Sequence, residues 1–205
     1  EQNTVLAITS QSENMQAVLD AAWELLLPAL DVPAERQDPA ADEKLADRLA
    51  ALRLAPVEAA ESPSAGAERW TEAAFTVAAG PDAEVNPGAS VPLAESVPVA
   101  AVGLAAGESG WQLTLSTEDD AVTVPVGLGE WAVAAGTPPV AGSGGWVDED
   151  TFRADVIMLE TPHRFQVTCS LRDRTATAAW RTVPLHKSAL SEMCAPRRPT
   201  GLLRP

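Results

Sequence analysis

The feature that most constrains the fold is a series of short β-type segments separated by tight turns. The expected strands cover residues 70–78, 97–104, 111–117, 121–126, 130–135, 151–160, 164–172 and 175–181. Segment 164–172 alternates apolar Phe165, Val167, Cys169 and Leu171 with polar residues, which is typical of a half-buried strand. Many short strands with tight turns predict a mainly antiparallel β-meander, barrel- or sandwich-like, that is closed or nearly closed.

The first thirty residues predict a different local structure. Residues 3–10 form an apolar, β-branched run that predicts a strand, and apolar residues then recur at helical spacing from Met15 to Leu26. We expect Ser10 to be the N-cap of this helix, with Ser12 as the alternative, and Pro28 to end it. Asp38 before Pro39 predicts the start of a second short helix over 39–53. The fold class is therefore α+β, with an N-terminal strand and one or two helices ahead of the β-meander.

The chain divides by composition into several parts. Residues 56–66 are rich in Ala, Glu, Ser and Pro and predict a linker. The expected organisation is a terminal strand and helix over 1–30, a short helix and linker over 31–66, a β domain over 67–195 and a loose tail over 196–205.

Charge and cysteine content limit the classes of partner. A net charge of −15 disfavours nucleic acid and anionic membrane surfaces, and no apolar run is long enough to span a bilayer. Cys169 and Cys194 are too few for a secreted disulfide framework, and the position of Cys169 predicts a buried thiol. This favours a cytoplasmic location, with any targeting signal lying upstream of Glu1.

Aromatic and acidic residues of the β region are open to functional and structural interpretations. Exposed tryptophans could stack on sugars, but a core role is the favoured interpretation for Trp70, Trp111, Trp131, Trp146 and Trp180. The acidic triplets 118–120 and 148–150 have residue types suited to calcium binding or glycoside hydrolysis. We favour solvated turns for both triplets, and a flexible turn for the glycine-rich segment 142–145.

Metal and cofactor sites are not predicted. The soft ligand types are His163, His186, Cys169 and Cys194, and they lack the short paired spacing of a zinc site. The sequence also has no glycine-rich phosphate loop and no dinucleotide fingerprint.

Three segments near the N-terminus carry a resemblance to a known family. Residues 5–10, 15–20 and 23–30 read VLAITS, MQAVLD and WELLLPAL, and they resemble the last strand and last helix of class C β-lactamase and penicillin-binding-protein-like serine hydrolases. Residues 145–151 and 160–163 resemble parts of the region that follows the catalytic core in some of those proteins. The resemblance implies that the strand's partners lie upstream of Glu1.

The catalytic motifs of that family are missing from the sequence. The family uses Ser-x-x-Lys, Tyr-x-Asn or Tyr-x-Ser, and Lys-Thr-Gly or His-x-Gly. Ala41 and Pro184 stand three residues before Lys44 and Lys187, and tyrosine is absent. We therefore predict a region that is inactive alone, attached to a parent that forms an acyl-enzyme with a β-lactam, ester or peptide.

The expected partner is the upstream catalytic domain of the same protein, or a second copy that packs on the 15–26 helix face. His163 and Arg164 follow a turn between two expected strands, and they are the polar groups we expect near a partner's active site. The alternative functions are a small-ligand-binding β-barrel module and a protein-interaction domain.

Overall fold

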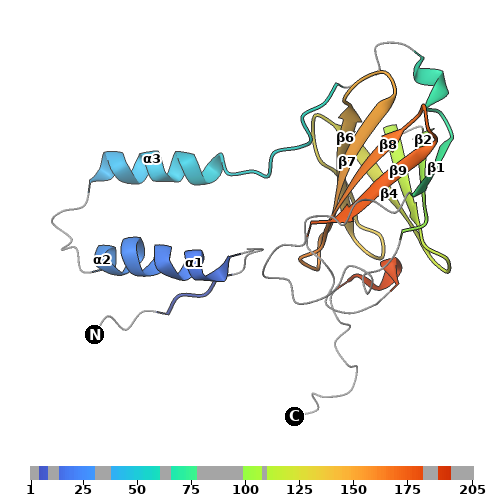
Figure 1. Cartoon of the computed structure of the whole chain (residues 1–205). Coiled ribbons are helices and arrows are strands. Elements are labelled where there is room, and N and C mark those ends of the chain that lie inside the picture. The colour runs from blue at the N-terminus through green and yellow to red at the C-terminus, as the bar shows by residue number, and fades with distance from the viewer. Residues whose placement is uncertain are drawn as a thin grey trace. The chain divides into compact units, whose positions relative to one another are not determined.

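The computed structural model describes residues 5–8, 14–30, 38–60, 66–77, 99–107, 110–181 and 189–194. The chain divides into two compact units, residues 1–54 and residues 55–205 (Figure 1). The first unit contains helices, and the second contains a β-barrel.

The first helix is continuous but changes its hydrogen-bonding pattern. It consists of α1 (Met15–Ala21), the π-helical turn η1 (Ala22–Leu26) and α2 (Leu27–Leu30). Asn14 is the N-cap and accepts a hydrogen bond from the Ala17 backbone N–H at 3.0 Å. The expectation of a cap at Ser10 or Ser12 is therefore wrong, and both serines lie outside the described residues.

Pro28 does not end this helix, contrary to the sequence-based expectation. A proline inside a helix lacks a donor and its ring crowds the carbonyl one turn earlier. Here the Leu27 N–H bonds to the Ala22 carbonyl five residues back. This wider π turn just before Pro28 relieves the crowding and lets the helix continue to Leu30.

The second helix, α3 (Pro39–Ala50), begins as predicted. The Asp38 carboxylate accepts hydrogen bonds from the Ala40 and Ala41 N–H groups, and Pro39 occupies the first turn. The strand predicted over residues 3–10 is not formed by its described residues, 5–8, which are exposed, so that part of the prediction is wrong. The described part of the chain offers this segment no strand to pair with, and an unpaired strand leaves its backbone groups unsatisfied.

Among the described residues, nine strands make up the sheet of the second unit. Their bounds are β1 (Ala73–Val77), β2 (Ala101–Gly107), β3 (Gly110–Ser116), β4 (Ala121–Leu128), β5 (Ala132–Ala134), β6 (Val140–Trp146), β7 (Thr151–Met158), β8 (Arg164–Ser170) and β9 (Thr175–Trp180).

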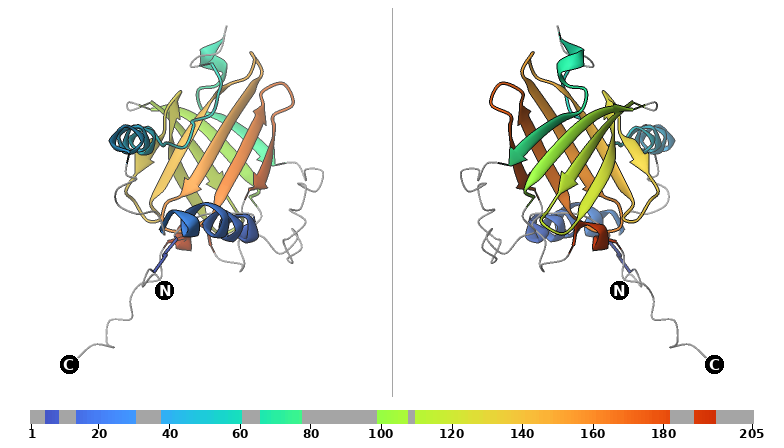
Figure 2. Two further views of the ribbon diagram at one scale, coloured as in Figure 1. Left: turned by 90° about the vertical axis from the view of Figure 1, so that its left-hand side faces the viewer. Right: turned by 90° about the vertical axis from the view of Figure 1, so that its right-hand side faces the viewer.

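The sheet closes into a barrel through two parallel seams. β1 to β4 form one antiparallel meander, and β6 to β9 form another (Figure 2). The meanders meet where β1 pairs with β9 and where β4 pairs with β6, both in parallel. The short β5 reverses the chain between β4 and β6 and, among the described strands, pairs with β6 alone. Because of this extra reversal, β6 runs parallel to β4 and β9 runs parallel to β1.

Both ends of the barrel are covered by a short 3₁₀ helix. At one end, η3 (Ala67–Arg69) leads into Trp70, whose side chain is fully buried among the barrel's aromatic rings. At the other end, η5 (Leu190–Glu192) contributes buried Leu190, followed by buried Met193. We call these the η3 end and the η5 end.

The interior is filled by apolar side chains. Trp70, Trp146 and Trp180 are buried, which confirms the core interpretation for these three, and Trp111 packs against the same core. Along β8 the burial alternates as predicted. Cys169 is buried and unpaired, and burial raises the pKa of its thiol to about 12.

The segment expected to be a flexible glycine turn is strand β6. All seven of its residues are buried. A Cβ added at Gly142 would lie 2.3 Å from the Pro125 carbonyl oxygen of β4, and one at Gly144 would lie 3.0 Å from the Phe152 ring. The glycines are therefore required by the close approach of neighbouring strands, and not by a turn.

The fold class is confirmed: helices precede a mainly antiparallel β-barrel. No helix among the described residues is long and apolar enough to cross a membrane.

Candidate functional site

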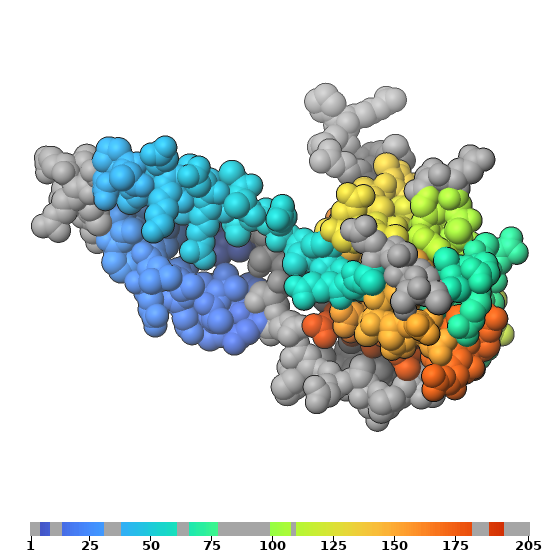
Figure 3. All heavy atoms as spheres, turned by 90° about the horizontal axis from the view of Figure 1, so that it is seen from above, coloured from blue at the N-terminus to red at the C-terminus, as the bar shows by residue number. Residues whose placement is uncertain are grey.

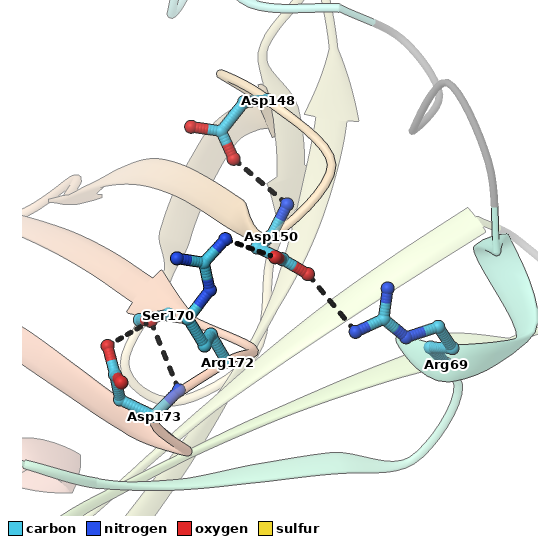
Figure 4. Close-up of polar contacts among 6 residues, drawn as sticks. All are labelled: Arg69, Asp148, Asp150, Ser170, Arg172 and Asp173. Carbon is cyan, nitrogen blue, oxygen red and sulfur yellow. Dashed lines mark hydrogen bonds and ion pairs between the residues drawn. The ribbon is translucent and has the colours of Figure 1, made fainter.

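A group of charged and polar side chains lies at the η3 end of the barrel (Figure 4). The β6–β7 turn supplies Asp148 and Asp150, and η3 supplies Arg69. The end of β8 and the turn after it supply Ser170, Arg172 and Asp173. We call these six residues the end cluster.

Asp150 is the centre of the end cluster. Its Oδ1 accepts from Arg69 Nη2 at 3.1 Å and its Oδ2 from Arg172 Nη2 at 3.3 Å. The side chains of both arginines are well exposed, so each ion pair contributes at most about 1 kcal/mol. Asp150 thus links η3 to the two turns.

Two further contacts organise the turns. The Asp150 backbone N–H donates to Asp148 Oδ1 at 2.9 Å, and this bond together with the Thr151 hydroxyl lowers the pKa of Asp148. The Ser170 hydroxyl donates to Asp173 Oδ2 at 2.8 Å.

A surface depression of about 430 Å³ lies over the end cluster. It is lined by Asp148, Glu149, Asp150, Thr151, Ser170, Arg172 and Asp173.

The contacts of the end cluster join neighbouring chain segments. Asp150 is occupied by two guanidinium groups, and the Ser170 hydroxyl is hydrogen-bonded to the Asp173 carboxylate. Within the described residues, no three His, Cys, Asp or Glu side chains are grouped to hold a metal. The calcium and glycoside-hydrolysis interpretations of 148–150 therefore gain no support. The arrangement ties three chain segments together beside Trp70.

The second acidic triplet also has a structural contact. Asp120, in the β3–β4 turn, accepts from the Ser191 N–H at 2.8 Å and from the Ala121 N–H at 2.9 Å. The Ser191 bond is the main cause of a lowered Asp120 pKa. Asp120 thereby holds η5 against the barrel end.

His163 and Arg164 lie at the η5 end, away from the end cluster. His163 Nδ1 is 2.9 Å from the Thr161 hydroxyl, its ring packs edge-on against Trp180, and burial lowers its pKa. Arg164 pairs with Asp155.

Asp155 is nearly fully buried on the outer wall of the barrel. Its carboxylate also accepts from Gln166 Nε2 at 3.1 Å. Arg164 Nε is buried and has no hydrogen-bond partner.

Sequence reasoning found Asp148 and Asp150 but missed the Asp150 partners Arg69 and Arg172, and it missed the neighbouring pair Ser170 and Asp173. Arg172 and Asp173 lie in or next to a turn that the sequence does predict, whereas Arg69 follows the predicted linker and lies in η3. Because neighbouring antiparallel strands bring alternate turns to the same end, the pairing of β7 with β8 would have placed turns 147–150 and 171–174 together. Arg69 could not have been placed without the strand order.

Besides the end cluster and the region of His163 and Arg164, a further candidate site is an apolar face on the first helix. Met15, Leu19, Trp23 and Leu26 are exposed by 57%, 44%, 61% and 37%, and no residue of α1, η1 or α2 is buried. These side chains recur at helical spacing and so form one stripe. A stripe of large apolar side chains is typical of an interaction surface.

Comparisons with protein-family models, with curated proteins and with solved structures found no match to this chain.

Proposed function

We propose that this chain is a non-catalytic accessory region of a β-lactamase-like serine hydrolase. In this proposal the first helix completes the upstream catalytic domain, and the barrel is appended to it. The observation that carries the proposal is the exposed stripe on the helix that also bears the family resemblance.

The exposed stripe requires a partner on energetic grounds. A short isolated helix is marginally stable in water, and helices in proteins gain most of their stability by burying an apolar face. Each large side chain of the stripe would contribute about 1.5–3 kcal/mol on full burial. The catalytic domain's sheet, which the family resemblance implies, offers such a surface.

The charge of the helix favours this partner over a second copy. Asp20 and Glu24 are the charged residues between positions 14 and 30, and both are acidic. Two copies packed through the same stripe would bring these carboxylates toward each other, which is unfavourable. A partner with neutral or basic residues around an apolar face fits better.

The first test is the intact mass of the native protein that contains this sequence. The proposal expects a mass well above 21.4 kDa and upstream peptides that include Ser-x-x-Lys. A native mass of 21.4 kDa would refute it.

The second test compares two substitutions in the native protein. Trp23→Asp should lower its unfolding free energy by at least about 2 kcal/mol, because it would place a charge in the proposed interface. Val133→Asp is the matched control, since Val133 is 63% exposed on β5 and has no proposed partner. Urea unfolding, with turnover of a chromogenic ester or β-lactam, gives the readout, and equal effects of the two variants would count against the proposal.

A further inference from the structure

Residues 55–60, which we call the strap, run along the outside of the barrel. Val57 is only 8% exposed, and its backbone N–H donates to the Ser143 hydroxyl at 3.0 Å. Ala60 pairs with Trp146 in both directions, with N···O distances of 2.9 and 3.0 Å. Figure 3 shows the turquoise atoms that precede η3 lying against the gold atoms of β6 and β7.

The wall beneath the strap is built from small residues. The outward positions of β6 are Ala141, Ser143 and Gly145, and the first two are 4% and 0% exposed. A Cβ at Gly145 would lie 2.7 Å from the Ala60 carbonyl oxygen and 2.8 Å from the Ala59 Cβ. This outer face of a barrel strand is therefore a groove shaped to receive a second backbone.

The groove recognises the strap mainly through backbone atoms. Ser143 accepts from the Val57 N–H, Arg153 Nη2 donates to the Glu58 carbonyl at 3.1 Å, and Trp146 pairs with the Ala60 backbone. Ala60 takes the edge of β6 beyond the last residue that pairs with β4. The one strap side chain that is buried is that of Val57.

These contacts are those of strand addition, in which main-chain hydrogen bonds give affinity and a pocket for one side chain gives selectivity. We propose that the outer face of β6 is a peptide-binding groove for an extended peptide segment that has an aliphatic residue and, two and three positions later, small residues. Residues 55–60 fill the groove in cis and can be replaced by an equivalent segment supplied in trans. The strap thus acts as a built-in competitor.

The covalent connection explains why the strap, and not a free peptide, occupies the groove. A segment tethered to its site has an effective concentration in the millimolar range, so a free peptide of equal affinity competes poorly. Weakening the strap should therefore open the groove to the same sequence added as a peptide. Because the strap and the groove both belong to the barrel unit, this inference does not depend on the proposed attachment to a hydrolase.

The test uses the full chain with Val57→Asp and a fluorescent peptide of residues 54–61. The variant should bind the peptide saturably, with at least about tenfold higher affinity than the unaltered chain shows. The amide resonances that shift should be those of β6 and β7. A peptide that itself carries Val57→Asp is the control and should not bind, since a carboxylate would enter the valine pocket.

Two outcomes would overturn the proposal. One is a folded Val57→Asp chain that fails to bind the unaltered peptide at millimolar concentration. The other is equal binding by the variant and the unaltered chain, which would place the peptide elsewhere. If Val57→Asp unfolds the barrel, Val57→Gly provides the milder variant, and the same comparison with the two peptides decides the question.

Discussion

At the residue scale, glycine positions in β6 are set by the distance between strands. Gly142 faces the Pro125 carbonyl oxygen of β4 at a distance that leaves no room for a methyl group. Gly136, in the loop before β6, has no atom within 4 Å of the position its Cβ would take. The same residue type is thus required at one position and dispensable at the other.

We expect Gly142→Ala to lower the unfolding free energy by about 1–3 kcal/mol, because backbone atoms of β4 would have to move. Gly136→Ala should change it by no more than about 0.5 kcal/mol. Urea denaturation followed by tryptophan fluorescence measures both. Equal values for the two variants would contradict the close packing of β4 on β6.

Asp120, which lies at the η5 end, makes the unfolding free energy of the barrel depend on pH. Its pKa is lowered from 3.8 in the folded chain, chiefly by the Ser191 N–H. The unfolded chain therefore binds more protons at acidic pH, and the contribution of Asp120 is full above about pH 5 and is lost as the pH falls through the folded pKa.

Asp120→Asn should accordingly reduce the loss of unfolding free energy between about pH 5 and pH 2. Asp119→Asn is the matched control, because Asp119 is an exposed neighbour in the same turn. Urea midpoints measured across this pH range provide the readout. Parallel pH profiles for Asp120→Asn and the unaltered chain would show that the contact with Ser191 contributes nothing.

At the element scale, η3 illustrates the different contributions of an ion pair and a buried ring. Arg69 and Trp70 are adjacent, but Arg69 makes an exposed ion pair with Asp150, whereas the Trp70 ring is buried edge-on against Trp146, with 6.2 Å between the ring centroids. We expect Trp70→Ala to cost about 3–5 kcal/mol and Arg69→Ala at most about 1 kcal/mol. Thermal unfolding of the two variants checks this ranking, and a larger loss for Arg69→Ala would reverse our account of the η3 end.

Most of the barrel strands could be predicted because their side chains alternate or their turns are marked. β8 is the clearest case, and Asp38 with Pro39 marked the start of α3 equally well. β6 could not be predicted, because a strand of small residues with both faces buried has no alternation to detect. The reason for its glycines becomes evident only in the folded structure, where Gly142 faces Pro125 and Gly144 faces Phe152.

The candidate sites were predictable to different degrees for the same reason. The stripe from Met15 to Leu26 depends on local helical spacing and could be found in the sequence. The partners of Asp150 depend on strand order, and the two parallel seams are not encoded in any local pattern. A meander with one short extra strand, β5, has a different closure from the simple antiparallel one that the turns alone suggest.

At the scale of the whole molecule, the boundary between the two units falls before the strap. Residues 56–66 look like a linker by composition, but Val57 and Ala60 contact the barrel. A segment's composition reports its own flexibility and carries no information about a complementary groove elsewhere in the chain. The boundary between the units lies between residues 54 and 55 because residues 57 and 60 contact β6, a strand far away in the sequence.

Two truncations test this boundary. A chain of residues 55–205 should keep the barrel's unfolding free energy within about 0.5 kcal/mol, because it retains every described contact of the strap. A chain of residues 61–205 should lose about 2–4 kcal/mol, since Val57 returns to water and the Ser143 and Trp146 groups lose their partners. Urea unfolding monitored by tryptophan fluorescence compares the two. A loss of the larger size already in the 55–205 chain would mean that the helical unit, and not the strap, supports the barrel.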